Sequence, residues 1–117
     1  MGIDLGILRE LFRNLQTFEA LHETTGIDIL TAPDGQEWSL WDLRYLYECR
    51  ERLSPRQRQA IELCLYANVK ETDAAVTMGL KPTTPVAIYA NNGLRRLIEM
   101  AEDGLLPHFR LDYLQAG

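Results

Sequence analysis

Residues 71–97 read ETDAAVTMGLKPTTPVAIYANNGLRRL, and this stretch decides the fold. A short helical pattern covers residues 71–78 and holds the small residue Ala75. Gly79 follows four residues later and readily adopts the positive φ at which many helices end. A Thr-rich turn then leads to the pair Thr84-Pro85, which predicts the start of the last long helix, because Thr is a good N-cap and Pro a good first helical residue.

This order of residue types is typical of a helix-turn-helix. The first helix needs a small residue where the second crosses it, and the turn needs a residue that accepts positive φ. The second helix needs an aliphatic residue, here Val86, to fix the crossing angle. Its N-terminal turn can then face base edges in the major groove of DNA. The alternative is that residues 71–97 form two packed helices of an all-α domain with no role on DNA.

The N-terminal half begins with a helical pattern. Apolar residues recur at three- and four-residue steps over residues 4–23, and Gly26 is placed to cap this helix. Residues 27–30 are short and β-branched, but they have no obvious partner strand, so we predict no sheet. Residues 32–35, Ala-Pro-Asp-Gly, predict a turn.

Two further helices precede the deciding stretch. Ser39 is expected to cap a helix over residues 40–51, and Ser54 with Pro55 is expected to open another that runs to about residue 67. The chain therefore predicts an all-α domain of four or five helices. We divide it into an N-terminal helical extension (1–52), a helix-turn-helix unit (53–104) and a C-terminal tail that packs (105–117).

Composition bounds the class of protein. The chain has 117 residues and a mass of 13.4 kDa, which fits one domain. Hydrophobic residues make up 46% and charged residues 25%, a globular rather than a disordered balance. No stretch free of charge reaches the ~18 residues of a membrane span, and the first residues lack the pattern of a secretory signal. We expect a cytoplasmic protein with no membrane partner, in which Cys49 and Cys64 are reduced and buried.

The net charge of −5 is unevenly distributed. Residues 1–53 carry a net charge of −5, residues 54–97 carry +3, and residues 98–117 carry −3. A basic centre between two acidic flanks fits a nucleic-acid surface confined to the centre, but it also fits chance variation on a solvated surface.

Motifs for catalysis or metal binding are weak. Glu19 and His22 have the Glu-x-x-His spacing of a bundle metal site, but that chemistry needs a second copy, which the chain lacks. Neither cysteine has a histidine near it in sequence, and the chain has no Gly-rich phosphate loop. We therefore expect no enzyme activity, no cofactor and no metal. Four aromatic residues lie between the turn at residues 32–35 and the basic centre. They are expected to pack in the core, or else to form an exposed platform for a partner: Trp38, Trp41, Tyr45 and Tyr47.

A family resemblance rests on three segments. They are residues 53–63 (LSPRQRQAIEL), residues 73–80 (DAAVTMGL) and residues 93–97 (GLRRL). Together they resemble the fourth conserved region of bacterial sigma factors, and small phage-encoded regulators of that sigma-like type. The resemblance covers roughly residues 53–98, under half of the chain. It implies a helical module that reads promoter DNA and can touch RNA polymerase.

The resemblance also implies which residues would contact DNA. Asn can pair with adenine through two hydrogen bonds, and Ala or the Thr methyl fits the thymine methyl. Arg and Lys at the flanks can bind phosphates without reading sequence. The candidates for base contact are Thr83, Thr84, Ala87, Ile88 and Asn91. The candidates for phosphate contact are Arg56, Arg58, Lys81, Arg95 and Arg96.

These observations favour a non-catalytic, DNA-binding transcription regulator of the phage type, which inserts the helix starting at Pro85 into the major groove. An alternative is a module that binds RNA polymerase or another protein and binds DNA weakly. A further alternative is a recognition subunit for phage DNA packaging, which predicts a large ring. The first helix either covers the core of its own domain, pairs two copies into a homodimer, or presents its acidic face to a protein such as polymerase.

Overall fold

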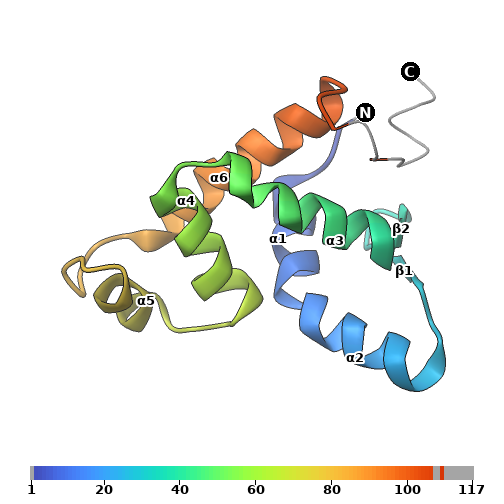
Figure 1. Ribbon diagram of the computed structural model, residues 1–117, viewed down its shortest axis with the longest axis horizontal. Helices are drawn as coiled ribbons and strands as arrows, with labels where there is room; N and C mark the ends of the chain where they lie inside the picture. Colours follow the sequence, from blue (N-terminus) through green and yellow to red (C-terminus); the bar gives the residue numbers. More distant parts are fainter. Residues whose placement is uncertain (1, 107–108, 110–117) are drawn as a thin grey trace.

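In the computed structural model, which describes residues 2–106 and residue 109, the first helical segment is two helices, α1 (Leu5–Arg13) and α2 (Leu15–Thr25) (Figure 1). They are separated at Asn14, which has φ −101° and ψ 4°. The Asn14 side-chain amide donates a hydrogen bond to the Glu10 carbonyl at 2.8 Å. Because this side chain competes for backbone groups, the helix breaks there. The prediction of one continuous helix over residues 4–23 is therefore wrong.

A two-stranded antiparallel hairpin follows, formed by β1 (Ile29–Thr31) and β2 (Glu37–Ser39). The prediction of no sheet was wrong, because the partner strand comes directly after the turn and is too short to show a period. The turn over residues 32–35 is confirmed, since the Ala32 N–H donates to the Gln36 carbonyl at 2.9 Å. Trp38 on β2 is 1% exposed and anchors the hairpin in the core.

The middle of the chain holds α3 (Leu40–Glu48), the 3₁₀ helix η1 (Cys49–Arg52), α4 (Pro55–Ala60) and the π-helix η2 (Ile61–Tyr66). The caps are as expected. Ser39 Oγ accepts from the Asp42 N–H at 3.0 Å, and Ser54 forms a capping box with Gln57. The helices differ from expectation in their second halves, where the α-helical hydrogen bonds change to 3₁₀ and π patterns.

The last two helices are α5 (Glu71–Thr77) and α6 (Val86–Glu102). Gly79 has φ 76°, and the Leu80 N–H donates to the Ala75 carbonyl at 2.8 Å, so the predicted end of α5 is confirmed. The start of α6 differs by one residue from the expected start at Pro85. Pro85 has ψ 79°, which is not helical, and it takes the N-cap position expected for Thr84.

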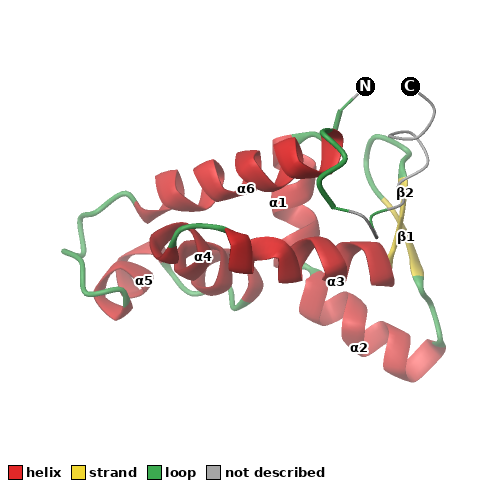
Figure 2. Cartoon of the chain, turned by 45° about the horizontal axis from the view of Figure 1, so that its top comes forward, coloured by secondary structure: helices red, strands yellow, loops and turns green. Residues whose placement is uncertain are grey.

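The buried side chains of the described residues form one cluster that draws on every helix. α6 packs against α1, α4, η2 and α5 (Figures 1 and 2). The packing is close at Gly93, where an added Cβ would lie 2.8 Å from Ile61 Cδ1 and 3.3 Å from Gln57 Cβ. In both views, α5 and the loop before α6 lie at one end of the molecule, and α2 with the hairpin lies at the other.

The fold is thus mostly helical, as expected, but the described part holds six α-helices and a small hairpin rather than four or five helices alone. No helix in this part is long and apolar enough to cross a membrane. Of the expected packed tail (105–117), Leu106 and Phe109 are buried and Leu105 is 49% exposed. Residues 107–108 and 110–117 lie outside the described residues.

The aromatic cluster divides between core and surface. Trp38 and Tyr47 are buried, which confirms the expected core packing for both. Trp41 is 67% exposed, so core packing is wrong for this residue. The reason is helical register: α3 turns Leu43 and Leu46 into the core, and Trp41 falls on the other face.

Candidate nucleic-acid interface

α6 has a buried face and an exposed face. Its buried face follows the core, with Val86, Ala90, Leu94 and Leu97 each at most 3% exposed. Residues four apart lie on the same side of a helix. The three base-contact candidates on this helix, Ala87, Ile88 and Asn91, lie outside this buried face. Ala87 and Ile88 are exposed, and Asn91 is half-buried.

The loop before α6 brings the two threonine candidates to the base of that face. Thr83 is exposed and Thr84 is half-buried. The Thr84 N–H donates to the Lys81 carbonyl at 2.9 Å, which closes a turn within the loop. α5 ends at Thr77 and α6 starts at Val86, so the connection is longer than the turn of about 3–4 residues usual in helix-turn-helix units.

Glu71 was missed by the sequence reasoning. Its Oε1 accepts a hydrogen bond from the Ala87 backbone N–H at 2.9 Å, although the two residues are 16 apart in sequence. A carboxylate is stabilising at a helix N-terminus, where unpaired N–H groups carry partial positive charge. The contact ties the first residue of α5 to the first turn of α6. It also places a negative charge beside the N-terminal turn of α6.

Three of the five phosphate-contact candidates are exposed cations without an ion pair in the described part of the chain. They are Arg56, Lys81 and Arg95. The Arg56 guanidinium lies 5.8 Å from the centre of the Tyr89 ring. Arg95 Nη1 donates to Asn92 Oδ1 at 3.0 Å, one turn away on the same helix. These three cations can turn toward a phosphate without breaking an ion pair.

The other two candidates are already paired. Arg58 lies 3.3 Å from Glu51 Oε2 and 4.0 Å from Glu62 Oε1. Arg96 lies 3.3 Å from Glu99 Oε2 on the same helix. Both pairs are partly exposed, so each holds its arginine only weakly.

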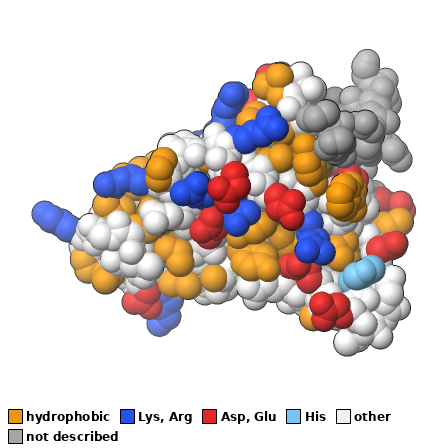
Figure 3. All heavy atoms as spheres, viewed as in Figure 1, with side chains coloured by type: hydrophobic (Ala, Val, Ile, Leu, Met, Phe, Trp, Pro, Cys, Tyr) orange, Lys and Arg blue, Asp and Glu red, His pale blue; other side chains and the backbone are white. Residues whose placement is uncertain are grey.

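Basic and acidic side chains are mixed on the face seen in Figure 3. Basic groups are frequent along the upper and left edges, over α6, α4 and the loop, while acidic groups lie near the middle and at the right end, over α2 and the hairpin. The structure therefore brings the five base-contact candidates to one helix face and the loop before it. It spreads the five phosphate candidates over α4, the loop and the second half of α6.

The two cysteines and the Glu19-x-x-His22 pair serve as packing or hydrogen-bonding groups in the structure. Cys49 is buried and Cys64 is half-buried, and both are free thiols. Burial raises the pKa of each thiol. Glu19 accepts from the Tyr66 hydroxyl at 3.1 Å and lies 3.6 Å from Arg44, while His22 Nδ1 lies 3.2 Å from the Ile27 carbonyl. The described residues hold no group of three or more potential metal ligands.

No protein-family model, curated protein or solved structure matches this chain.

Proposed function

We propose that the chain is a non-catalytic, DNA-binding transcription regulator whose helix-turn-helix consists of α5, the loop after it and α6. The observation that carries this proposal is the exposed face of α6. That face bears Ala87, Ile88 and Asn91 with Arg95 one turn beyond, and the core covers only the opposite side of the helix. An exposed helix face with small, amide and cationic residues in this order suits the major groove.

Each candidate has a chemical role in this proposal. Asn91 pairs with an adenine, whose N6 and N7 offer one donor and one acceptor to the amide. Ala87 and Ile88 contact thymine methyl groups, which are the apolar features of the major groove. Arg56, Lys81 and Arg95 bind phosphates and set the orientation of the helix without reading sequence.

The resemblance of residues 53–98 to the fourth conserved region of sigma factors supports the same proposal. The small residue Ala75 is fully buried, and Gly79 has the positive φ that such a unit requires. α4 approaches α6 closely at Gly93, so the helix that precedes α5 buttresses the reading helix from behind.

The test is selection of bound sequences from a pool of random duplexes, followed by binding of the selected duplex over a series of salt concentrations. An enriched motif with affinity that falls steeply as salt rises supports a sequence-reading DNA binder. Salt-sensitive binding without a motif points to an architectural or packaging role. A folded sample that binds no duplex at low salt overturns the proposal.

A second candidate function is a module that binds RNA polymerase or another protein. It is favoured by two exposed aliphatic side chains on α5 and α6, Val76 at 58% and Ile88 at 55% exposure. It is also favoured by the ion pairs that engage Arg58 and Arg96. Binding of purified, nuclease-treated bacterial RNA polymerase that is lost in Ile88→Ala, with no duplex binding, would select this candidate.

A further inference from the structure

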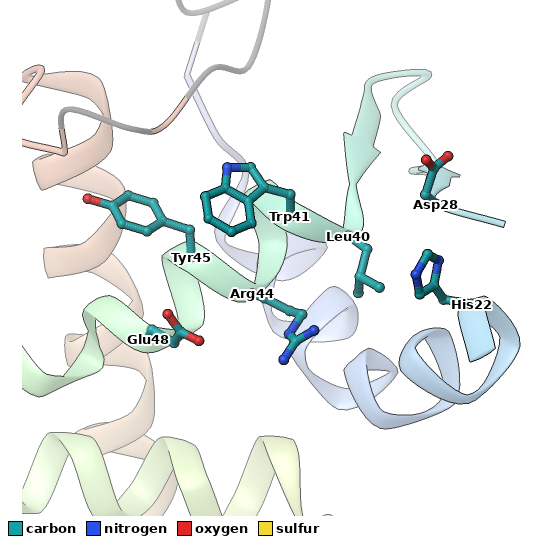
Figure 4. Close-up of a pocket in the computed structure, with 7 residues that line it drawn as sticks. All are labelled: His22, Asp28, Leu40, Trp41, Arg44, Tyr45 and Glu48. Atoms are coloured by element: carbon teal, nitrogen blue, oxygen red, sulfur yellow. The ribbon is translucent and has the colours of Figure 1, made fainter. Parts of the chain in front are cut away.

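A cavity of about 370 Å³ opens beside α3 (Figure 4). In Figure 1, α3 runs from the middle of the molecule towards the hairpin, away from α5. Leu40, Trp41 and Tyr45 supply its apolar lining, and all three project from α3. Asp28 and Glu48 bring carboxylates to its edge from opposite sides. A cavity of this size holds one or two apolar side chains rather than a large cofactor.

The segments that contribute to this cavity also carry exposed hydrophobic side chains. Four of the seven large hydrophobic side chains exposed in the described residues fall within residues 21–41: Leu21, Ile27, Ile29 and Trp41. Trp41 is the most exposed of all seven, at 67%. Single exposed hydrophobic residues need no explanation, but Trp41 is exposed beside a cavity with an apolar lining, a combination that fits an interaction site. Tryptophan is also enriched among the residues that dominate binding energy at interfaces.

The same region carries strong negative charge. Residues 21–48 contain six acidic residues against one arginine, a net charge of −5 with His22 neutral. Asp42 is buried. The other five carboxylates are exposed: Glu23, Asp28, Asp34, Glu37 and Glu48. The one arginine, Arg44, also lines the cavity, and its charge is opposed by Glu19 at 3.6 Å. The cavity itself is therefore lined by two carboxylates, Asp28 and Glu48, against one arginine, within a stretch of chain whose net charge is negative.

We propose that this α2–α3 surface, formed by residues 21–48, binds a basic peptide segment of a partner protein that inserts an apolar side chain beside Trp41. Lysine or arginine of the segment would face Asp28 and Glu48 while its anchor fills the cavity. Charge complementarity of this kind steers association and selects partners. The proposal is independent of DNA binding by α6.

Charge decides between this occupant and the others. Nucleic acid is excluded because its phosphates would face the exposed carboxylates. A second copy related by two-fold symmetry would set the same acidic surface against itself. A segment with positive charge and an apolar anchor satisfies both features of the surface at once.

The experiment uses the full chain and three synthetic peptides of about twelve residues. The first combines Lys and Leu at helical spacing, the second replaces Lys by Glu, and the third replaces Leu by Ala. Affinities are measured by calorimetry at physiological salt. We expect the Lys/Leu peptide to bind at least about tenfold more tightly than either control. Binding should also shift the Trp41 emission to shorter wavelength.

Two variants locate the site. Trp41→Ala should weaken the Lys/Leu peptide about tenfold or more, whereas Ile88→Ala, which removes a comparably exposed side chain from α6, should leave its affinity within about twofold. Buried Trp38 remains as a fluorescent reporter that the variant is folded. Equal binding by wild type and Trp41→Ala, or equal binding of the Glu/Leu peptide, overturns the proposal. Sedimentation that shows a dimer lost in Trp41→Ala overturns it in favour of a second copy.

Discussion

Glu71 Oε1 accepts a hydrogen bond from the Ala87 backbone N–H at 2.9 Å, so the first residue of α5 caps the first turn of α6. α6 has no capping side chain of its own, because the residue before its first turn is Pro85. The loop between the two helices covers residues 78–85, and this hydrogen bond joins the start of α5, before the loop, to the first turn of α6, after it. The first turn of α6 is therefore capped by a residue 16 positions earlier in the sequence.

Glu71→Ala should lower the free energy of unfolding by about 1 kcal/mol, as loss of a helix cap does. Glu71→Gln keeps an acceptor oxygen and should retain most of the stability. Urea unfolding of the two variants beside the wild type measures the difference. If Glu71→Ala unfolds at the same urea concentration as the wild type, the contact does not stabilise α6.

The charge of Glu71 gives a separate prediction for DNA binding. Because the carboxylate lies beside the N-terminal turn of α6, Glu71→Gln should bind duplex DNA more tightly than the wild type at low salt, and the gain should shrink as salt rises. A filter-binding or anisotropy series over salt concentration measures this. A gain that persists unchanged at high salt would mean that electrostatic repulsion is not its cause.

Gly93→Ala should destabilise the fold although alanine is the better helix former by about 1 kcal/mol. The added Cβ would lie 2.8 Å from Ile61 Cδ1, 3.2 Å from Leu53 Cδ1 and 3.3 Å from Gln57 Cβ, where α6 packs against α4 and η2. Overpacking of this kind typically costs about 1–3 kcal/mol. Chemical unfolding measures the net effect.

The matched control for Gly93 is a double-mutant cycle with Ile61→Val, which removes the Cδ1 atom that the new methyl group meets. Gly93→Ala should cost less in the Ile61→Val background than in the wild type, because the two sites are in contact. Additive effects of the two substitutions would show that crowding against Ile61 is not the cause.

Asn91 and Arg95 should affect DNA binding in different ways. Asn91→Ala should relax the preferred base at one position of the selected motif, at a cost of about 1–3 kcal/mol for the preferred duplex. Arg95→Ala should weaken all duplexes alike and reduce the salt slope by about one. Arg96→Ala should do less than Arg95→Ala, since Arg96 is paired with Glu99. An unchanged motif in Asn91→Ala rules out its role in base reading.

The parts of the fold that could be predicted are those with a local cause. Ser39, Ser54 and Gly79 act on backbone groups within a few residues of themselves, so their positions in the sequence were enough. The break at Asn14 was missed because the apolar period continues through it. The hairpin was missed because its strands are three residues long, which is too short for a pattern.

In the candidate site, too, features with a local cause could be predicted from the sequence, and features that depend on tertiary packing could not. The exposed side of α6 follows from helical period, so Ala87 and Asn91 could be placed from the sequence. The Glu71 contact and the pairing of Arg58 with Glu51 could not, because both join residues that only tertiary packing brings together. The exposure of Trp41 depends on the register of a single helix turn, which composition alone does not determine.

Tyr47 should make stability depend on pH above 10. Burial raises its pKa from 10.0 to about 12, and the nearby Arg50 guanidinium, 4.2 Å from the ring centre, only partly opposes this. A pKa raised in the folded state stabilises the fold below the unfolded value and loses that effect as pH rises through the folded value. The free energy of unfolding should therefore fall between pH 10 and 12, by at most about 3 kcal/mol from this group. Urea unfolding at pH 8 and pH 11 measures this loss in the wild type and in Tyr47→Phe. Between these two pH values, Tyr47→Phe should lose less free energy of unfolding than the wild type. An equal loss in both proteins would show that Tyr47 is not the group responsible.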